Sequence, residues 1–200
     1  MRKLLFAAAT MALSAVSAGP LRMQNIAHRG MWDREVPQNT VESIRRAYEA
    51  GATWVETDFW HVKSGLMVCM HADRELAEFA LTKKKTVDLT AEDLATLNLG
   101  AKDNLPKPFR VPTLEQVLAA VPKTGVVQAE IKHYTPQYAD LFDAAVAKAG
   151  LTERNVVVSS FDYKALKDFK ARYPKYRAVW LTGLKKPKDG AAFDVKPYIA

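Results

Sequence analysis

Cysteine is almost absent from this sequence: Cys69 is the only one among 200 residues. The chain therefore forms no disulfide within itself, and its stability has to come from packing or from a bound metal ion. Cys69 alternates with neighbouring residues of a short apolar run, so its thiol is most simply a small buried side chain.

Long hydrophobic runs are absent as well. The longest, residues 4–16, is too short to cross a bilayer comfortably. It follows Arg2 and Lys3 and ends at the small residues Val16-Ser17-Ala18, an order typical of a secretory signal peptide. We expect residues 1–18 to be removed and the protein to be secreted or periplasmic, without stable membrane insertion. A buried N-terminal helix or a membrane anchor is the alternative interpretation.

The sequence also lacks a long block of like charge. The formal net charge is +7, and the basic residues are spread along the chain except for the run Lys83-Lys84-Lys85. Such a short run is typical of a solvated loop, so we expect no nucleic-acid partner. A mildly basic protein suits an anionic small-molecule substrate, although charge alone does not identify one.

What the sequence does contain is an alternation of β-rich and helical segments. Strands are expected at 25–27, 53–59, 66–70, 126–131, 156–160 and 177–181, and amphipathic helices at 40–50, 113–120, 137–149 and 163–173. Asn39 with Glu42 is interpreted as the capping box of the first helix. This alternation is typical of βα units on a parallel sheet, so residues 19–200 are expected to form one α/β domain.

Residues 72–112 interrupt this rhythm. They are mostly polar and show one short helical pattern, at 91–97. We interpret them as an insertion, which after a barrel strand is usually functional or a small subdomain.

Three carboxylates stand out near strand ends. Glu56 and Asp58 are two residues apart and share one face of an otherwise apolar strand, where like charges are costly to bury. Glu130 lies toward the carboxyl end of a later strand, and in parallel barrels such ends meet at the active site. The three would suit a hard divalent cation, Ca²⁺ or Mg²⁺. An exposed edge strand with scattered charges is the alternative.

Basic and imidazole side chains follow strands in the same way. His28 and Arg29 follow the first strand and His71 the third, while Lys132 follows Glu130 by two residues. Two histidines can serve as general base and general acid, and Arg29 and Lys132 can bind a phosphate. A simple ion pair with Glu130 is the alternative for Lys132. His61 and His133 are out of phase with the carboxylates and are expected to face away.

The ordered set of motifs resembles the glycerophosphodiester phosphodiesterase family. Its pieces are H-R-G at 28–30, P-Q-N-T at 37–40, E-x-D at 56–58, His71, P-T-L-E at 112–115 and E-x-K at 130–132. The resemblance implies a TIM-type barrel and hydrolysis of glycerophosphodiesters to glycerol 3-phosphate and an alcohol. It implies one divalent cation on Glu56, Asp58 and Glu130, catalysis by His28 and His71, and phosphate contacts from Arg29 and Lys132.

Three departures from the family pattern accompany this resemblance. Gln38 stands where the family has Glu, and His71-Ala72-Asp73 replaces His-Asp, as if one residue were inserted. The strand count ends at six, so we expect a barrel truncated after the sixth strand, with open sheet edges that favour association. A lysophospholipid- or sphingolipid-cleaving relative and an inactive remnant that at most binds phosphodiesters remain alternatives.

Overall fold

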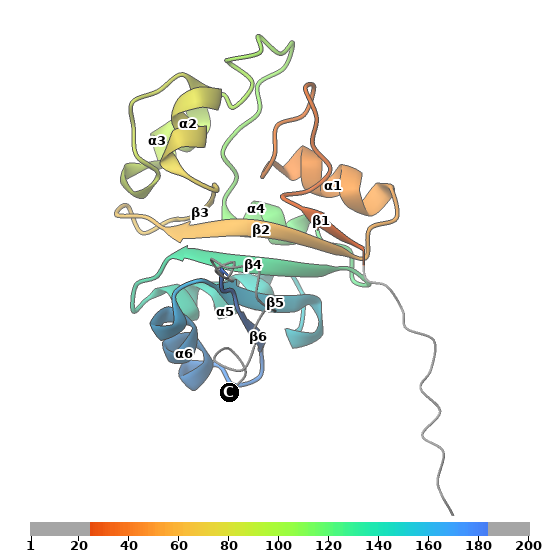
Figure 1. The fold of residues 1–200 in the computed structure, drawn as a ribbon, viewed down its shortest axis with the longest axis vertical. Helices are drawn as coiled ribbons and strands as arrows, with labels where there is room; N and C mark the ends of the chain where they lie inside the picture. Colours follow the sequence, from red (N-terminus) through yellow and green to blue (C-terminus); the bar gives the residue numbers. More distant parts are fainter. Residues whose placement is uncertain (1–24, 184–200) are drawn as a thin grey trace, which may run out of the picture.

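The computed structural model describes residues 25–183, which form a curved sheet with helices packed against it (Figure 1). Five strands follow one another across the sheet, each parallel to its neighbour, in the order β1-β2-β4-β5-β6. They are β1 (Ile26–His28), β2 (Trp54–His61), β4 (Val126–His133), β5 (Val156–Ser160) and β6 (Arg177–Trp180). The expected parallel α/β architecture is confirmed.

Helices connect these strands and cover one face of the sheet. They are α1 (Val41–Glu49), α4 (Leu114–Ala119), α5 (Tyr138–Lys148) and α6 (Tyr163–Arg172), with a 3₁₀ turn η2 (Glu153–Asn155) before β5. Alternate strand residues such as Val55, Val127 and Val158 pack against Ile44, Phe142 and other helix side chains in the main core. The intervening strand residues therefore point to the other face, the interior of a partial α/β barrel.

The segment at 66–70 is not a parallel strand, and that expectation is wrong. β3 (Met67–Cys69) pairs antiparallel with β2, with Cys69 opposite Phe59, and lies off the main strand path. The reason is the short Lys63-Ser64-Gly65 connection, because a parallel pair needs a crossover of a dozen or more residues. The described residues thus hold five parallel strands and one hairpin strand, not six barrel strands.

The cap of α1 also differs from the expected Asn39–Glu42 pair. Thr40 is the N-cap: its hydroxyl accepts from the Ser43 amide, and the Ser43 hydroxyl accepts from the Thr40 amide. Asn39 instead adopts a left-handed conformation, with φ at 56°, and turns its side chain toward the sheet interior. The helix therefore begins one residue later, because Asn39 has another partner.

Residues 72–112 form a lobe beside β3 that contains more helix than expected (Figure 1). Besides α3 (Ala91–Thr96), it holds α2 (Asp73–Ala80) and the 3₁₀ turn η1 (Thr86–Asp88). α2 escaped the sequence pattern because only Glu75 and Leu76 of its residues are buried. Leu76, Leu89, Leu99 and Phe109 build a second apolar cluster beneath this lobe.

Two further expectations concern membrane insertion and the signal peptide. No helix within residues 25–183 is both long enough and apolar enough to span a membrane. The expected signal peptide, residues 1–18, lies outside the described residues, so it stays a prediction.

Candidate active site

The three carboxylates expected to bind metal lie together on the interior face of β2 and β4. Asp58 is the register partner of Glu130 across the two strands, and Glu56 precedes Asp58 by one pleat on the same face. One oxygen from each carboxylate can be chosen so that all three lie within 4.8 Å of one another, and all three residues are buried. Both strands run beyond these residues, to His61 and His133, so the site lies within the strands rather than at their last residues.

Burial and mutual repulsion make this cluster costly when it is ionised. Burial, followed by the charges of Asp58 and Glu130, raises the pKa of Glu56 to about 8. Burial also raises the pKa of Glu130, although a hydrogen bond from Lys132 opposes the shift. Both shifts arise from excess negative charge in a site shielded from water.

Two cationic side chains compensate only part of this negative charge. Lys132 Nζ lies 3.0 Å from Glu130 Oε1 and 3.6 Å from Asp58 Oδ1. Arg29 Nε lies 3.7 Å from Asp58 Oδ2 and has no hydrogen-bond partner, although the atom is buried. The ion pair considered for Lys132 is therefore present, and its amine nevertheless borders the same cavity as the carboxylates.

Arg29 is held by a left-handed turn that follows β1. Its backbone is left-handed, with φ at 58°, and Gly30 follows with φ at 83°. The Arg29 amide donates to the Glu56 carbonyl, and its guanidinium Nη1 donates to Gln38 Oε1 at 3.1 Å. Gln38, the departure from the family pattern, thus still supplies an acceptor for Arg29.

Asn39 is a site residue that our sequence analysis assigned to a helix cap. Its Nδ2 donates to Asp58 Oδ2 at 2.9 Å, and its Oδ1 lies 3.4 Å from the Cys69 thiol. Asp58 is thereby fixed in orientation by a neutral donor. Cys69 is buried, as expected.

His28 and His71 reach the site from β1 and β3, two strands that both pair with β2. His28 Nε2 lies 3.6 Å from Glu56 Oε2, while two thirds of the side chain is exposed. Partial burial of the imidazole lowers the pKa of His28, and the positive charge of Arg29 lowers it further. His71 follows β3, and the antiparallel course of that strand brings it back toward Asp58, whose carbonyl accepts from the Met70 amide. The expectation that His71 ends a parallel strand was wrong, yet both histidines line one cavity.

Glu75 is the carboxylate that sequence analysis missed. Its Oε2 lies 2.7 Å from His71 Nδ1, and its Oε1 lies 3.3 Å from Arg29 Nη1. Asp73, the Asp of the altered His-Asp motif, instead accepts from the Thr86 amide at 2.7 Å. The overlooked signal was the spacing of four residues between His71 and Glu75 across the start of α2.

The cavity bordered by these groups has a volume of about 360 Å³. Its lining comprises His28, Arg29, Glu56, His71, Gln128, Glu130, Lys132, Phe161 and Leu181. Four buried carboxylates, those of Glu75 and the cluster of three, face two side-chain cations in this region. The residues therefore fit a hard divalent cation, which would balance the remaining negative charge and prefers oxygen ligands.

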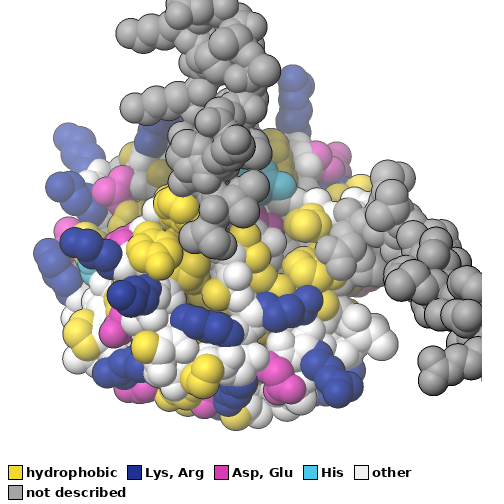
Figure 2. Space-filling view, turned by 60° about the horizontal axis from the view of Figure 1, so that its bottom comes forward, with side chains coloured by type: hydrophobic (Ala, Val, Ile, Leu, Met, Phe, Trp, Pro, Cys, Tyr) yellow, Lys and Arg dark blue, Asp and Glu magenta, His cyan; other side chains and the backbone are white. Residues whose placement is uncertain are grey.

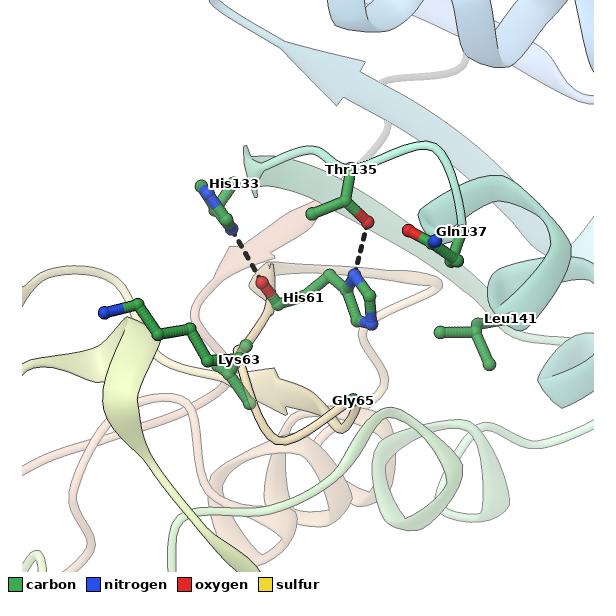
Figure 3. A pocket seen from close by; sticks show the side chains of 8 residues that line it. His61, Lys63, Gly65, His133, Thr135, Gln137 and Leu141 are labelled. Atoms are coloured by element: carbon green, nitrogen blue, oxygen red, sulfur yellow. Dashed lines mark hydrogen bonds between the residues drawn. The ribbon is translucent and has the colours of Figure 1, made fainter.

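The other two histidines lie away from this cavity, as expected. Figure 3 shows the His61 ring turned toward the Thr135 hydroxyl, which its Nδ1 contacts, whereas His133 Nδ1 lies 2.6 Å from the His61 carbonyl oxygen. Both line a second cavity, of about 530 Å³, with Gln137 and Leu141. Their contacts tie the β2–β3 hairpin to the segment between β4 and α5.

Basic side chains are not gathered into one block on the face drawn in Figure 2. Lys and Arg side chains alternate there with acidic, apolar and uncharged surface. The Lys83-Lys84-Lys85 run includes an ion pair between Lys84 and Asp93 of the insertion. These observations agree with interpreting that run as an ordinary surface segment.

Comparisons with known proteins all lead to the same family. Residues 28–193 match the model of the glycerophosphoryl diester phosphodiesterase family. A glycerophosphodiester phosphodiesterase of Caldanaerobacter subterraneus is 31% identical over 170 residues, a match that includes 81% of this chain and 68% of that protein. Human glycerophosphodiester phosphodiesterase 1 is 36% identical over 101 residues, 49% of this chain and 30% of the human protein. The match thus spans about two thirds of the Caldanaerobacter protein and less than a third of the human protein.

Solved structures share the fold. A phosphodiesterase of Oleispira antarctica in complex with the product sn-glycerol-3-phosphate superposes with a TM-score of 0.67 at 23% identity, over 84% of this chain and 69% of that one. A glycerophosphodiester phosphodiesterase of Parabacteroides distasonis gives 0.62 at 28% identity, over 78% and 63%. This likeness agrees with the partial barrel described above.

Proposed function

Because the chain belongs to the glycerophosphoryl diester phosphodiesterase family, we propose that it hydrolyses glycerophosphodiesters to glycerol 3-phosphate and an alcohol, with one divalent cation. The observation that carries this proposal is a cluster of three buried carboxylates, two of which line one cavity together with two histidines and two cationic side chains. The bound glycerol 3-phosphate named for the Oleispira structure supports the same product class.

The cation site is formed by Glu56, Asp58 and Glu130. When bound, Mg²⁺ or Ca²⁺ supplies a Lewis acid for a phosphoryl oxygen. Asn39 holds the Asp58 carboxylate in place through its amide, and Lys132 holds Glu130. These contacts keep the cluster in position in the absence of substrate.

Arg29 and Lys132 supply positive charge to the phosphodiester. Both are largely buried and border the carboxylates, so their charges act in a region of low dielectric. Arg29 Nη1 donates to Gln38 and Glu75, whereas its buried Nε faces Asp58 without a hydrogen bond. Arg29 also lines the cavity, where its positive charge suits an anionic phosphodiester oxygen.

His28 and His71 move the protons. One imidazole removes the proton of the attacking hydroxyl, which is the glycerol 2-hydroxyl or water, and the other delivers a proton to the leaving alcohol oxygen. Both histidines line the cavity, and His28 contacts Glu56 of the carboxylate cluster, so both imidazoles can reach a substrate bound there.

A turnover assay tests this function. Release of choline or ethanolamine from glycerophosphocholine or glycerophosphoethanolamine should depend on Mg²⁺ or Ca²⁺, stop with a chelator and resume when the cation is restored. His28→Ala and His71→Ala should each lower kcat by about 10²–10⁴-fold, the usual contribution of acid–base catalysis. His133→Ala, in the second cavity, is the matched control.

The outcomes separate the alternatives. Cation-independent turnover, or unchanged kcat in both histidine variants with intact circular dichroism, would contradict the proposal. Lysophosphatidylcholine is assayed in parallel, and preferential release of choline from it would favour the lysophospholipid alternative. No turnover of any substrate by the folded, cation-loaded chain would favour the inactive remnant.

A further inference from the structure

Glu75 links two groups of the candidate active site that otherwise do not contact each other. Its carboxylate is buried, with Oε2 2.7 Å from His71 Nδ1 and Oε1 3.3 Å from Arg29 Nη1. No motif noted in the sequence includes it. We propose that Glu75 is the positioning residue of His71, holding its proton on Nδ1 so that Nε2 is the atom available in the cavity. This inference rests on the proposed function, in which His71 moves a proton.

The local structure explains why a carboxylate at this position reaches back to His71. Glu75 is the third residue of α2, where a Glu side chain commonly folds back to the N-cap amide. The N-cap is Ala72, which offers no side-chain cap, and the Glu75 carboxylate extends one residue further, to the imidazole of His71. Asp73 instead contacts the Thr86 amide, so Glu75 is the carboxylate that reaches His71.

The chemistry of the three partners fixes the direction of the hydrogen bonds. An ionised carboxylate only accepts, and a guanidinium only donates. Neutral His71 therefore donates from Nδ1 to Glu75, and Nε2 keeps its lone pair. Because Glu75 Oε1 simultaneously accepts from Arg29, the carboxylate is held from both sides and the orientation of the imidazole is defined.

Glu75→Gln is a direct test because it keeps the shape of the side chain. It changes only the hydrogen bond between position 75 and His71 Nδ1, in which position 75 becomes the donor. Arg29 can only donate, so it will retain the amide oxygen, and the amide NH₂ will face His71 Nδ1. Nδ1 must then accept, and the proton moves to Nε2. We expect ¹⁵N NMR of the neutral imidazole in the full chain to show protonated Nδ1 in the original protein and protonated Nε2 in E75Q. The His71 signals are assigned by their loss in His71→Asn.

The kinetic expectation follows from the same exchange. In E75Q, kcat for glycerophosphocholine should fall by about 10²–10⁴-fold. The reason is that the proton of neutral His71 would lie on Nε2, the wrong nitrogen for its proton transfer. KM should change much less, since Arg29 keeps its contact with position 75. In the His71→Ala background, E75Q should cause no further loss of kcat, because the positioning residue acts only through His71.

Two control variants separate positioning from a general effect on α2. Glu78→Gln lies on the same helix but pairs with Lys102 at the surface, so it should change neither the tautomer nor kcat. Asp73→Asn tests the rival carboxylate: it removes the negative charge while the amide Oδ1 can still accept from the Thr86 amide, and it should leave the His71 tautomer unchanged.

The NMR measurement distinguishes failure of this inference from failure of the proposed function. Unchanged protonation of Nδ1 in E75Q would overturn the role of Glu75, as would a further loss of kcat in the His71→Ala background. If the chain turns over no glycerophosphodiester, the proposed function fails, whereas a tautomer change in E75Q would still establish that Glu75 sets the state of His71.

Discussion

Glu56 is the residue at which burial and charge conflict most strongly. Its pKa is raised from an ordinary value of 4.5 to about 8, so the folded protein holds a proton there that the unfolded chain releases. Without cations, this residue therefore opposes folding progressively as the pH rises between those two values. A cation bound at the proposed site would remove the conflict, because the ion would take the place of that proton.

The first prediction concerns this pH dependence. In the presence of a chelator, the contribution of Glu56 to the free energy of unfolding should fall as the pH rises from about 5 to about 8. Adding Ca²⁺ or Mg²⁺ should raise Tm more at the upper end of this range than at the lower end. Thermal unfolding followed by circular dichroism measures both effects.

Glu56→Gln is the control for that measurement. A side chain that does not ionise cannot contribute to the pH slope, so the slope of the chelated protein should flatten. An equal gain in Tm from the cation at both ends of the pH range would contradict the assignment of Glu56 as a ligand that must lose its proton.

At the scale of elements, the turn after β1 is docked directly onto α1. The Met31 amide donates to the Ser43 carbonyl, and the Ser43 hydroxyl contacts the Arg29 carbonyl. Gly30 lies between them, with φ at 83°, and a Cβ there would lie 2.6 Å from the Ser43 carbonyl carbon. Glycine is therefore required in H-R-G by backbone packing as well as by conformation.

The second prediction compares two glycines with the same φ. Gly65 also has φ at 83°, but a Cβ there would meet no atom within 4 Å. Gly65→Ala should cost only the strain of the left-handed conformation, about 1–3 kcal/mol. Gly30→Ala should cost clearly more, because α1 must move away from the turn, and it should also lower kcat by displacing Arg29. Chemical denaturation measures the two losses, and equal losses would show that the contact with α1 does not constrain the turn.

At the scale of the whole molecule, the sheet has two open edges within residues 25–183. β1 and β6 each pair with one neighbouring strand in this range, and all four residues of β6 are exposed. Val179 and Trp180 are 42% and 43% exposed there. Unpaired strand edges that carry apolar side chains favour pairing with other chains.

The third prediction is that the protein associates through β6 as its concentration rises. Val179→Lys should reduce this association, since a charge on an edge strand disfavours pairing. Leu81→Lys is the control, because Leu81 is 68% exposed but lies in the insertion, away from both edges. Light scattering after gel filtration, over a wide range of protein concentration, measures the effect. A monomer at every concentration, or equal effects of the two variants, would contradict it.

Much of the architecture was predictable because its signals are local. The alternation of apolar runs with amphipathic helices placed every parallel strand to within a few residues, and strand periodicity put Glu56 with Asp58, and Glu130 with Lys132, on common faces. The reversal between β2 and β3 was also predictable, since residues 63–65 are too few for a crossover. Our expectation of six parallel strands failed because that signal was not used.

The sequence by itself determined which residue types stand at which strand positions, and hence the chemistry available to the site. Only the tertiary structure decided which of them meet: the register of Asp58 with Glu130, the diversion of Asn39 from a helix cap to Asp58, and the choice of Glu75 over Asp73 beside His71. Strand register between segments far apart in the chain depends on side-chain packing on both faces of the sheet, which no local pattern encodes. A buried polar group, likewise, takes the partner that the folded chain brings within reach, and this need not be the one nearest in sequence.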